Sequence, residues 1–89
     1  MRAVVTVVGK DQKGIIAKTS MILFENEVNI LDISQTIMQD MFTMIMLVEY
    51  DNDDVNVKTL TQKLNALAEE MGLSIHLQRE EIFSSMHRI

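Results

Sequence analysis

Short apolar runs and longer amphipathic segments alternate along this chain. The first run, residues 2–8, holds five consecutive β-branched residues, VVTVV. Such a run without polar alternation is typical of a strand buried on both faces. Apolar residues then recur at helical spacing over residues 12–26, which predicts a helix. Its expected buried residues are Ile15, Ile16, Ile22 and Leu23.

The second half of the chain repeats this alternation. Residues 28–39 and 42–50 predict two further strands, joined by a turn at residues 39–41. After a polar break at residues 51–54, a helix is expected that ends at Gly72. Its apolar stripe consists of Val57, Leu60, Leu64, Leu67, Ala68 and Met71. Leu73, Ile75 and Leu77 then alternate with polar residues, as in a strand with one buried face.

The last apolar residues, Ile82, Phe83, Met86 and Ile89, predict a short tail helix at about residues 80–89. The element order is therefore βαββαβ followed by a tail. Right-handed crossovers arrange such a chain as a four-stranded antiparallel sheet, order 4-1-3-2, with two helices on one face. We expect an α+β, ferredoxin-like sandwich that forms a single domain over residues 1–89, with its core in residues 1–79.

Two helices in one layer cover only one face of a sheet, and the strand at residues 28–39 is an edge strand with apolar residues on both faces. The uncovered face and the apolar edge both favour a protein partner. Hydrophobic residues make up 47% of only 89 residues, which supports the same conclusion. We expect a homodimer or a higher homo-oligomer.

Composition excludes several classes of function. The chain has no cysteine, which excludes disulfides, thiolate metal sites and thiol nucleophiles. A formal charge of −5 argues against nucleic-acid and anionic-membrane partners. Apolar runs are too short for a signal peptide or a membrane span, so a soluble cytoplasmic protein is expected. No serine stands beside a histidine–carboxylate pair, and no metal-ligand spacing occurs, so neither an enzyme, a metal site nor a cofactor is expected.

The loop at residues 9–14, GKDQKG, joins the first strand to the first helix. Backbone N–H groups at a helix N-terminus lack intrahelical partners and favour an anion, so this loop outlines a small-molecule pocket. Three other classes of protein with this fold are excluded, because the residues that each requires are missing from this loop or from the strands. A heavy-metal module needs a cysteine pair, an RNA-recognition module needs exposed aromatic residues, and an acylphosphatase-like enzyme needs an arginine in the loop.

The segments VVGKDQKGIIA (residues 7–17) and VNILDISQT (residues 28–36) together resemble the ACT domain family. The resemblance covers nearly the whole chain and implies a regulatory module that binds amino acids or other small effectors. Two positions depart from the family pattern. Lys13 stands where the family often has proline, and Glu27 stands where it often has glycine.

The resemblance also implies a ligand site shared between subunits, with the loop of one facing the start of the second strand of its partner. Carried onto this chain, the site comprises Gly9, Lys10, Asp11, Gly14, Ile15, Asn29, Ile30 and Leu31. Structural roles remain open for several of them. Asp11 suits the N-cap of the helix, Asn29 suits a local turn, and the two glycines suit a tight turn or close helix–sheet packing.

Two hypotheses for function follow from the resemblance. The first is a standalone regulatory domain that senses an amino acid or related metabolite as a homo-oligomer and acts in trans on a regulated enzyme or transcription factor. The second is an adaptor without a ligand that docks on a metabolic enzyme or transcriptional regulator. The second resembles the ACT-only regulators of glycine cleavage operons.

Overall fold

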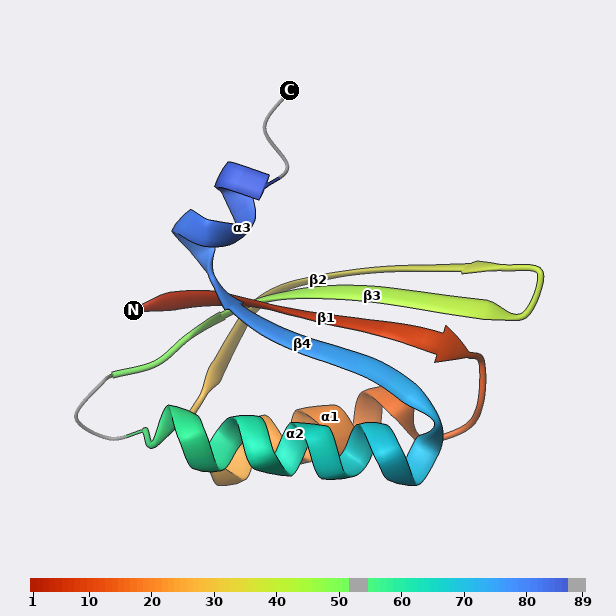
Figure 1. Ribbon diagram of the computed structural model, residues 1–89, viewed down its shortest axis with the longest axis horizontal. Coiled ribbons are helices and arrows are strands. Elements are labelled where there is room, and N and C mark those ends of the chain that lie inside the picture. The colour runs from red at the N-terminus through yellow and green to blue at the C-terminus, as the bar shows by residue number, and fades with distance from the viewer. Residues whose placement is uncertain (52–54, 87–89) are drawn as a thin grey trace.

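The computed structural model describes residues 1–51 and 55–86, and the side chains of residues 1–51 and 55–83. Its elements follow the expected order: β1 (Arg2–Lys10), α1 (Ile15–Glu25), β2 (Asn29–Met38), β3 (Met41–Glu49), α2 (Val57–Met71), β4 (Leu73–Arg79) and α3 (Glu80–Met86). The strands form one antiparallel sheet in the order β2-β3-β1-β4. This order confirms the predicted topology. Helices α1 and α2 cover one face, while α3 stands on the opposite side (Figure 1).

Side-chain alternation along the central strands places the core between the sheet and the α1–α2 layer. Ala3, Val5 and Val7 of β1 are completely buried on that face. On the opposite face Val4 is 5% exposed, at the end of β1 near α3, but Thr6 and Val8 are only half-buried. The first strand is therefore fully buried on one face, and the expectation of burial on both faces is correct only at Val4.

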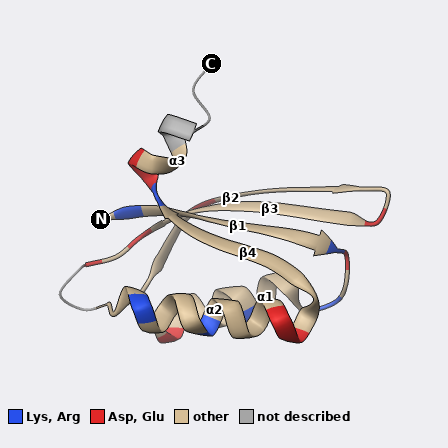
Figure 2. Cartoon of the chain, in the orientation of Figure 1, with Lys and Arg blue, Asp and Glu red and all other residues tan. Residues whose placement is uncertain are grey.

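Charged side chains lie mainly on the helices, in the turns and near the strand ends, and the middle of the sheet carries few (Figure 2). Within the described residues, no helix is both long enough and apolar enough to cross a membrane.

The start of α1 differs from the prediction. The helix begins at Ile15 and its N-cap is Gly14, whose φ of 90° is left-handed. Asp11 lies three residues before this cap, so its predicted role as the N-cap is wrong. The buried face also differs from the expected one: Ile15 and Leu23 are buried and Ile22 is half-buried, but Ile16 is 39% exposed.

The chain turns out of the C-terminal end of α1 without a glycine. Asn26 is the C-cap with a φ of −105°, and its side-chain Nδ2 donates to the Ile22 carbonyl at 2.7 Å. Glu27 then adopts the left-handed conformation, with a φ of 62°. Glu27 therefore carries the left-handed backbone at this turn, and Asn26 caps the helix.

Strands β2 and β3 form a hairpin closed by Gln39 and Asp40, with φ values of 50° and 70°. Two consecutive positive φ angles are the mark of a type I′ turn, whose twist matches that of paired strands. The pairing is interrupted once, near the start of β2. Ile30 pairs with Val48 and Asp32 with Leu47, so Leu31 is an extra, bulged residue.

Helix α2 follows its predicted pattern closely. The side chain of Asn56 caps it by accepting a hydrogen bond from the Thr59 N–H at 3.1 Å, and Gly72 ends it with a φ of 68°. The predicted stripe supplies the buried residues Leu60, Leu64 and Leu67, although Val57 is 39% exposed. Residues 52–54 and 87–89, which include part of the polar break and Ile89, lie outside the described residues.

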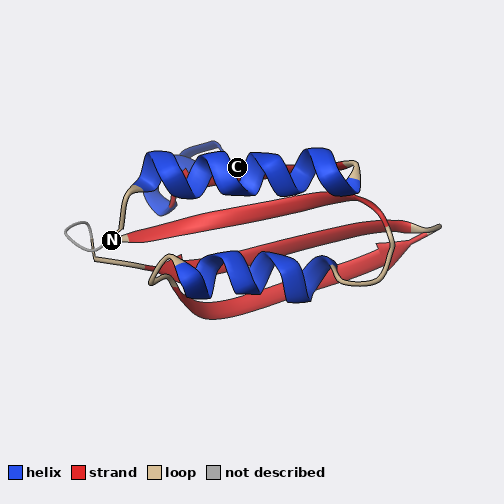
Figure 3. Cartoon of the chain, turned by 90° about the horizontal axis from the view of Figure 1, so that it is seen from below, coloured by secondary structure: helices blue, strands red, loops and turns tan. Residues whose placement is uncertain are grey.

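Helices α1 and α2 lie side by side across the sheet (Figure 3). The Lys18 ammonium of α1 contacts the Glu70 carboxylate of α2 at 3.0 Å. Both side chains are more than half exposed, so this ion pair contributes little to stability. The apolar contacts beneath the helices hold the layer to the sheet.

Candidate functional site

A pocket of about 280 Å³ lies between the N-terminus of α1 and the last part of β2. One wall consists of the loop and helix residues Asp11, Gln12, Gly14, Ile15, Ile16 and Ala17. The other wall consists of Gln35 and Ile37 of β2 and Phe42 of β3. The pocket therefore joins the loop predicted from sequence to the closed end of the β2–β3 hairpin.

Two hydrogen bonds hold the loop in position. The Asp11 N–H donates to the carbonyl oxygen of Asp40 in the hairpin turn at 2.7 Å. Gln12 Nε2 donates to the Met71 carbonyl at the end of α2 at 2.8 Å, and more weakly to the Lys10 carbonyl at 3.3 Å. The loop is thus fastened to the hairpin on one side and to the C-terminal end of α2 on the other.

The N-terminus of α1 offers hydrogen-bond donors to this pocket. The first helical bond is from the Lys18 N–H to the Gly14 carbonyl at 2.9 Å, and no side chain caps the N-terminus. The N–H groups of residues 15–17 precede that bond, and all three residues line the pocket. Uncapped amides at the positive end of a helix dipole favour a carboxylate or another anion.

The remaining pocket surface combines one carboxylate with apolar side chains. Asp11 is exposed and is the only charged residue among those that line the pocket. Ile16, Ile37 and Phe42 provide the apolar surface. A ligand with a carboxylate, an ammonium and a small apolar group would match the amides, Asp11 and this surface respectively.

Both glycines of the loop have structural roles. A Cβ at Gly9 would collide with the side chain of Leu73 and approach its Cα to 3.3 Å, so glycine permits close packing of β1 against β4. Gly14 adopts a left-handed φ, in which other residues are strained. These roles fit the turn-and-packing interpretation of the glycines, and Gly14 lines the pocket as well.

The predicted site residues fall into two groups at opposite ends of the sheet. Gly9, Lys10, Asp11, Gly14 and Ile15 gather at the loop. Asn29 pairs with Glu49 at the far end of β3, whereas Lys10 pairs with Met41 at the near end. At about 3.3 Å per residue, the two groups are roughly 25 Å apart within one chain.

The second group is accessible. Asn29 and Leu31 are exposed and Ile30 is half-buried. The Asn29 side chain makes no hydrogen bond to any residue that the structure describes. One chain does not bring Asn29, Ile30 and Leu31 to the loop, so their role in a ligand site stays a prediction that requires a second copy.

Sequence reasoning missed the opposite wall of the pocket. Gln35, Ile37 and Phe42 form that wall, and Gln12, Ile16 and Ala17 on the first wall were not predicted either. A usable signal existed in the hairpin: a two-residue turn at residues 39–40 makes Ile37 pair with Phe42, and the order β2-β3-β1 places that pair beside the end of β1.

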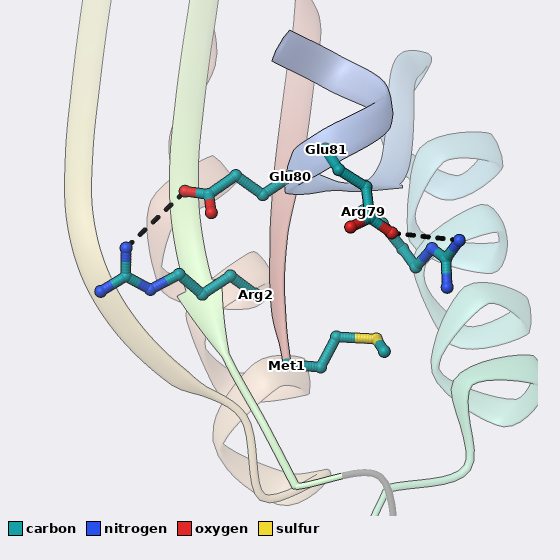
Figure 4. Close-up of a pocket in the computed structure, with 5 residues that line it drawn as sticks. All are labelled: Met1, Arg2, Arg79, Glu80 and Glu81. Atoms are coloured by element: carbon teal, nitrogen blue, oxygen red, sulfur yellow. Dashed lines mark ion pairs between the residues drawn. The ribbon is translucent and has the colours of Figure 1, made fainter. Parts of the chain in front are cut away.

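A second hollow of about 420 Å³ lies where α3 leaves β4, lined by Met1, Arg2, Arg79, Glu80 and Glu81 (Figure 4). Its arginines already contact carboxylates: Arg2 approaches Glu80 at 3.8 Å, and Arg79 approaches Glu81 at 3.1 Å. Because these arginines already pair with carboxylates, the hollow is a weaker anion site than the N-terminus of α1.

Across residues 1–51 and 55–86, no three His, Asp or Glu side chains lie close enough together to form a metal site.

Comparisons with known proteins agree with this architecture. A model of the ACT domain matches residues 2–78. A UPF0237 protein of Methanocaldococcus jannaschii is 51% identical over 88 residues, covering 99% of this chain and 98% of the relative. A UPF0237 protein of Clostridium perfringens is 52% identical over 89 residues, the full length of both. An ACT domain protein from Streptococcus pneumoniae superimposes with a TM-score of 0.78 at 36% identity, covering 93% of each chain.

Proposed function

This chain belongs to the ACT domain family, typically ligand-binding regulatory domains, and we propose that it is a cytoplasmic sensor of a small amino acid or related metabolite. It would act in trans as a homo-oligomer and would regulate rather than catalyse. One observation carries the proposal: the pocket at residues 11–17 combines uncapped amides, one carboxylate and an apolar wall.

The pocket favours an α-amino acid with a small apolar side chain. The ligand carboxylate would accept hydrogen bonds from the first amides of α1, and its ammonium would pair with Asp11. Its side chain would lie against Ile37 and Phe42. At about 280 Å³, the pocket is near the lower end of the range for ligand sites, roughly 300–1,000 Å³, which favours a small ligand.

The second part of the proposed site would come from a second copy through the free edge of β2. Strand β2 is an edge strand, and its Leu31, Ile33 and Ile37 are 39%, 41% and 57% exposed. An exposed apolar edge favours pairing with another strand. A two-fold axis at Ile33 would pair the two β2 strands antiparallel, with Ile33 facing its own copy.

This pairing would reunite the two groups of predicted site residues. Residue numbers in such a pair sum to 66 for residues 32–34 and to 65 beyond the bulge at Leu31, so Ile30 of one copy would face Gln35 of the other, and Asn29 would face Thr36. Ile37 and Gln35 both line the pocket. The distance of roughly 25 Å within one chain would thus become a direct contact between copies, with Ile30 against the pocket wall and Asn29, which the family resemblance assigns to the ligand, at the adjacent position.

Ligand screening tests the proposal. The purified protein is mixed with each amino acid, and both the melting temperature and the binding heat are measured. A ligand at 100 times its Kd stabilises the folded state by about 2.7 kcal/mol, a readily detected shift. The expected result is stabilisation by small apolar amino acids and by few others.

Two substitutions then locate the site. Asp11→Asn and Asn29→Ala should each weaken binding roughly ten- to a hundred-fold, the loss expected for one hydrogen bond to a charged group. Asn65→Ala, at an exposed position on α2, is the matched control and should bind as the parent protein does. If no amino acid or related metabolite shifts the melting temperature, the sensor proposal fails and the ligand-free adaptor becomes the better account.

A further inference from the structure

We propose that the side of α1 facing away from the sheet is a docking surface for a basic amphipathic helix of the regulated protein. Three exposed apolar residues form this surface, and two carboxylates beside it select a basic partner. The proposal rests on the action in trans of the proposed function, but it does not require the ligand.

The surface is a row of apolar side chains on α1. The buried residues of this helix are Ile15, Thr19 and Leu23. At about 100° per residue, Ala17, Met21 and Phe24 lie on the opposite side of the helix, and we call them the outer row. All three are exposed, Met21 by 54% and Phe24 by 76%. Figure 3 shows this side of both helices on the outside of the molecule.

The outer row differs from the same position on α2. Opposite its buried leucines, α2 presents Lys58, Gln62 and Glu69, as expected of a helix that faces water. Packing of the helix layer against the sheet therefore does not require apolar residues on the outside. A group of exposed apolar side chains of this kind marks an interaction site.

Pairing of two copies through β2 would leave the outer row open. The row points away from the sheet, whereas the free edge of β2 lies in the plane of the sheet. Ala17, at the start of the row, also lines the pocket, so a partner seated on the row would lie next to the ligand.

The C-terminal end of the row is negatively charged. Glu25 stands one turn after Met21, and Glu27 follows the helix; within residues 1–51 and 55–83 neither takes part in an ion pair. The last turn of α1 holds no basic residue, so the negative end of the helix dipole adds to these carboxylates. A Lys or Arg of the partner would be attracted here and would also stack favourably on the Phe24 ring.

A helix is the partner that fits these dimensions. The spacing of four and three residues in the outer row is the ridge pattern that packs against another helix at about 8–10 Å. Phe24 provides the aromatic anchor. The row is only about 10 Å long, so the contact is small and of the weak, transient kind. Nucleic acids and anionic membranes are disfavoured because Glu25 and Glu27 repel them.

Titration with a labelled peptide tests the surface. The probe is an amphipathic peptide of leucine and lysine at helical spacing, with a counterpart in which glutamate replaces lysine, and binding is followed by fluorescence anisotropy. The lysine peptide should bind at least about ten-fold more tightly than its counterpart. Phe24→Ser should weaken its binding at least about ten-fold by removing the anchor. Val57→Ser, at a side chain 39% exposed on α2, is the matched control and should bind within about two-fold of the parent protein.

A second pair of variants tests the charge. Glu27→Gly removes a carboxylate and relieves a φ of 62°, so it should raise the melting temperature yet weaken the lysine peptide about three- to ten-fold. Asp40→Gly also removes a carboxylate from a left-handed position, with a φ of 70°, but in the hairpin turn, beside the loop that precedes α1. It should raise the melting temperature as well and weaken the peptide by less than about two-fold, because it lies far from Phe24.

The outcomes are distinct. An affinity that falls in Phe24→Ser and Glu27→Gly but in neither control supports the docking surface. No detectable binding of the lysine peptide, equal binding of both peptides, or unchanged binding in folded Phe24→Ser overturns it. Light scattering that shows a smaller assembly for Phe24→Ser than for the parent protein also overturns it, because the row is then a contact between copies. Phosphatidylcholine vesicles that bind the parent protein but not Phe24→Ser would assign the row to a membrane instead. The titration uses protein without ligand, so a failed amino-acid screen would overturn the sensor and leave these outcomes unchanged.

Discussion

Thr19 is the best place to test the energetics of the α1 layer. Its side chain is fully buried, and its Oγ1 has no hydrogen-bond partner among the described residues. A buried hydroxyl without a partner costs about 1–3 kcal/mol in lost solvation. Valine has nearly the same shape and a similar helix propensity, so Thr19→Val replaces the hydroxyl without opening a cavity.

We expect Thr19→Val to raise the free energy of unfolding by about 1–2 kcal/mol. For a domain of this size, each kcal/mol corresponds to roughly 4–8 °C in melting temperature. Urea denaturation followed by circular dichroism measures the change, and an unchanged m-value shows that the folded and unfolded states are otherwise comparable. Thr61→Val, at a half-buried position on α2, is the control and should change stability by less than about 0.5 kcal/mol.

Thr19→Ser separates the hydroxyl from the methyl group. It keeps the hydroxyl and removes a buried methyl, so it should destabilise the protein by about 1 kcal/mol. If Thr19→Val is instead equal to the parent protein or less stable, the hydroxyl does have a partner in solution. The carbonyl one turn earlier, at Ile15, is the nearest in sequence, and the reasoning from an unpaired hydroxyl would then be wrong.

Three further substitutions test the fold by urea denaturation. Leu64→Ala should cost about 2–5 kcal/mol because Leu64 is 1% exposed beneath α2; a loss below about 1 kcal/mol would contradict that burial. Asn56→Ala should cost about 1 kcal/mol through loss of the N-cap, and Asn56→Ser should restore most of it. Gly14→Ala should cost about 1–2 kcal/mol because its φ of 90° is strained for alanine; equal stability would mean that the cap relaxes.

Where one physical effect dominates, sequence reasoning predicts this structure well. Helix α2 has Asn56 and Gly72 at its ends, and only one face of its stripe can be buried. Strand β4 alternates apolar and polar residues without interruption, so only one register buries Ile75. These local patterns, together with the handedness of crossovers, suffice for the strand order.

The candidate site was harder to predict because it depends on contacts between distant segments. Asp11 is a preferred capping residue, yet its N–H bonds to Asp40 in the hairpin, and the helix starts later, at Ile15 with Gly14 as its N-cap. Gln35 and Ile37 reach the pocket only because the hairpin register and the strand order place them there. No local pattern carries that information, and the pairing of two copies proposed above is even less local.

The extra residue at Leu31 has a consequence for insertions and deletions in this chain. After the bulge, Ile33, Gln35 and Ile37 share the face of Met46, Met44 and Phe42. If Leu31 were paired with Leu47 instead of bulged, every later residue of β2 would turn to the opposite side, because side chains alternate with a period of two. Ser34 and Thr36 would then replace Gln35 and Ile37 at the pocket. Deletion of Leu31 would instead remove only the bulge: Asp32 would stay opposite Leu47 and Ile37 would stay at the pocket, so this position should tolerate a one-residue deletion better than the paired positions of β2.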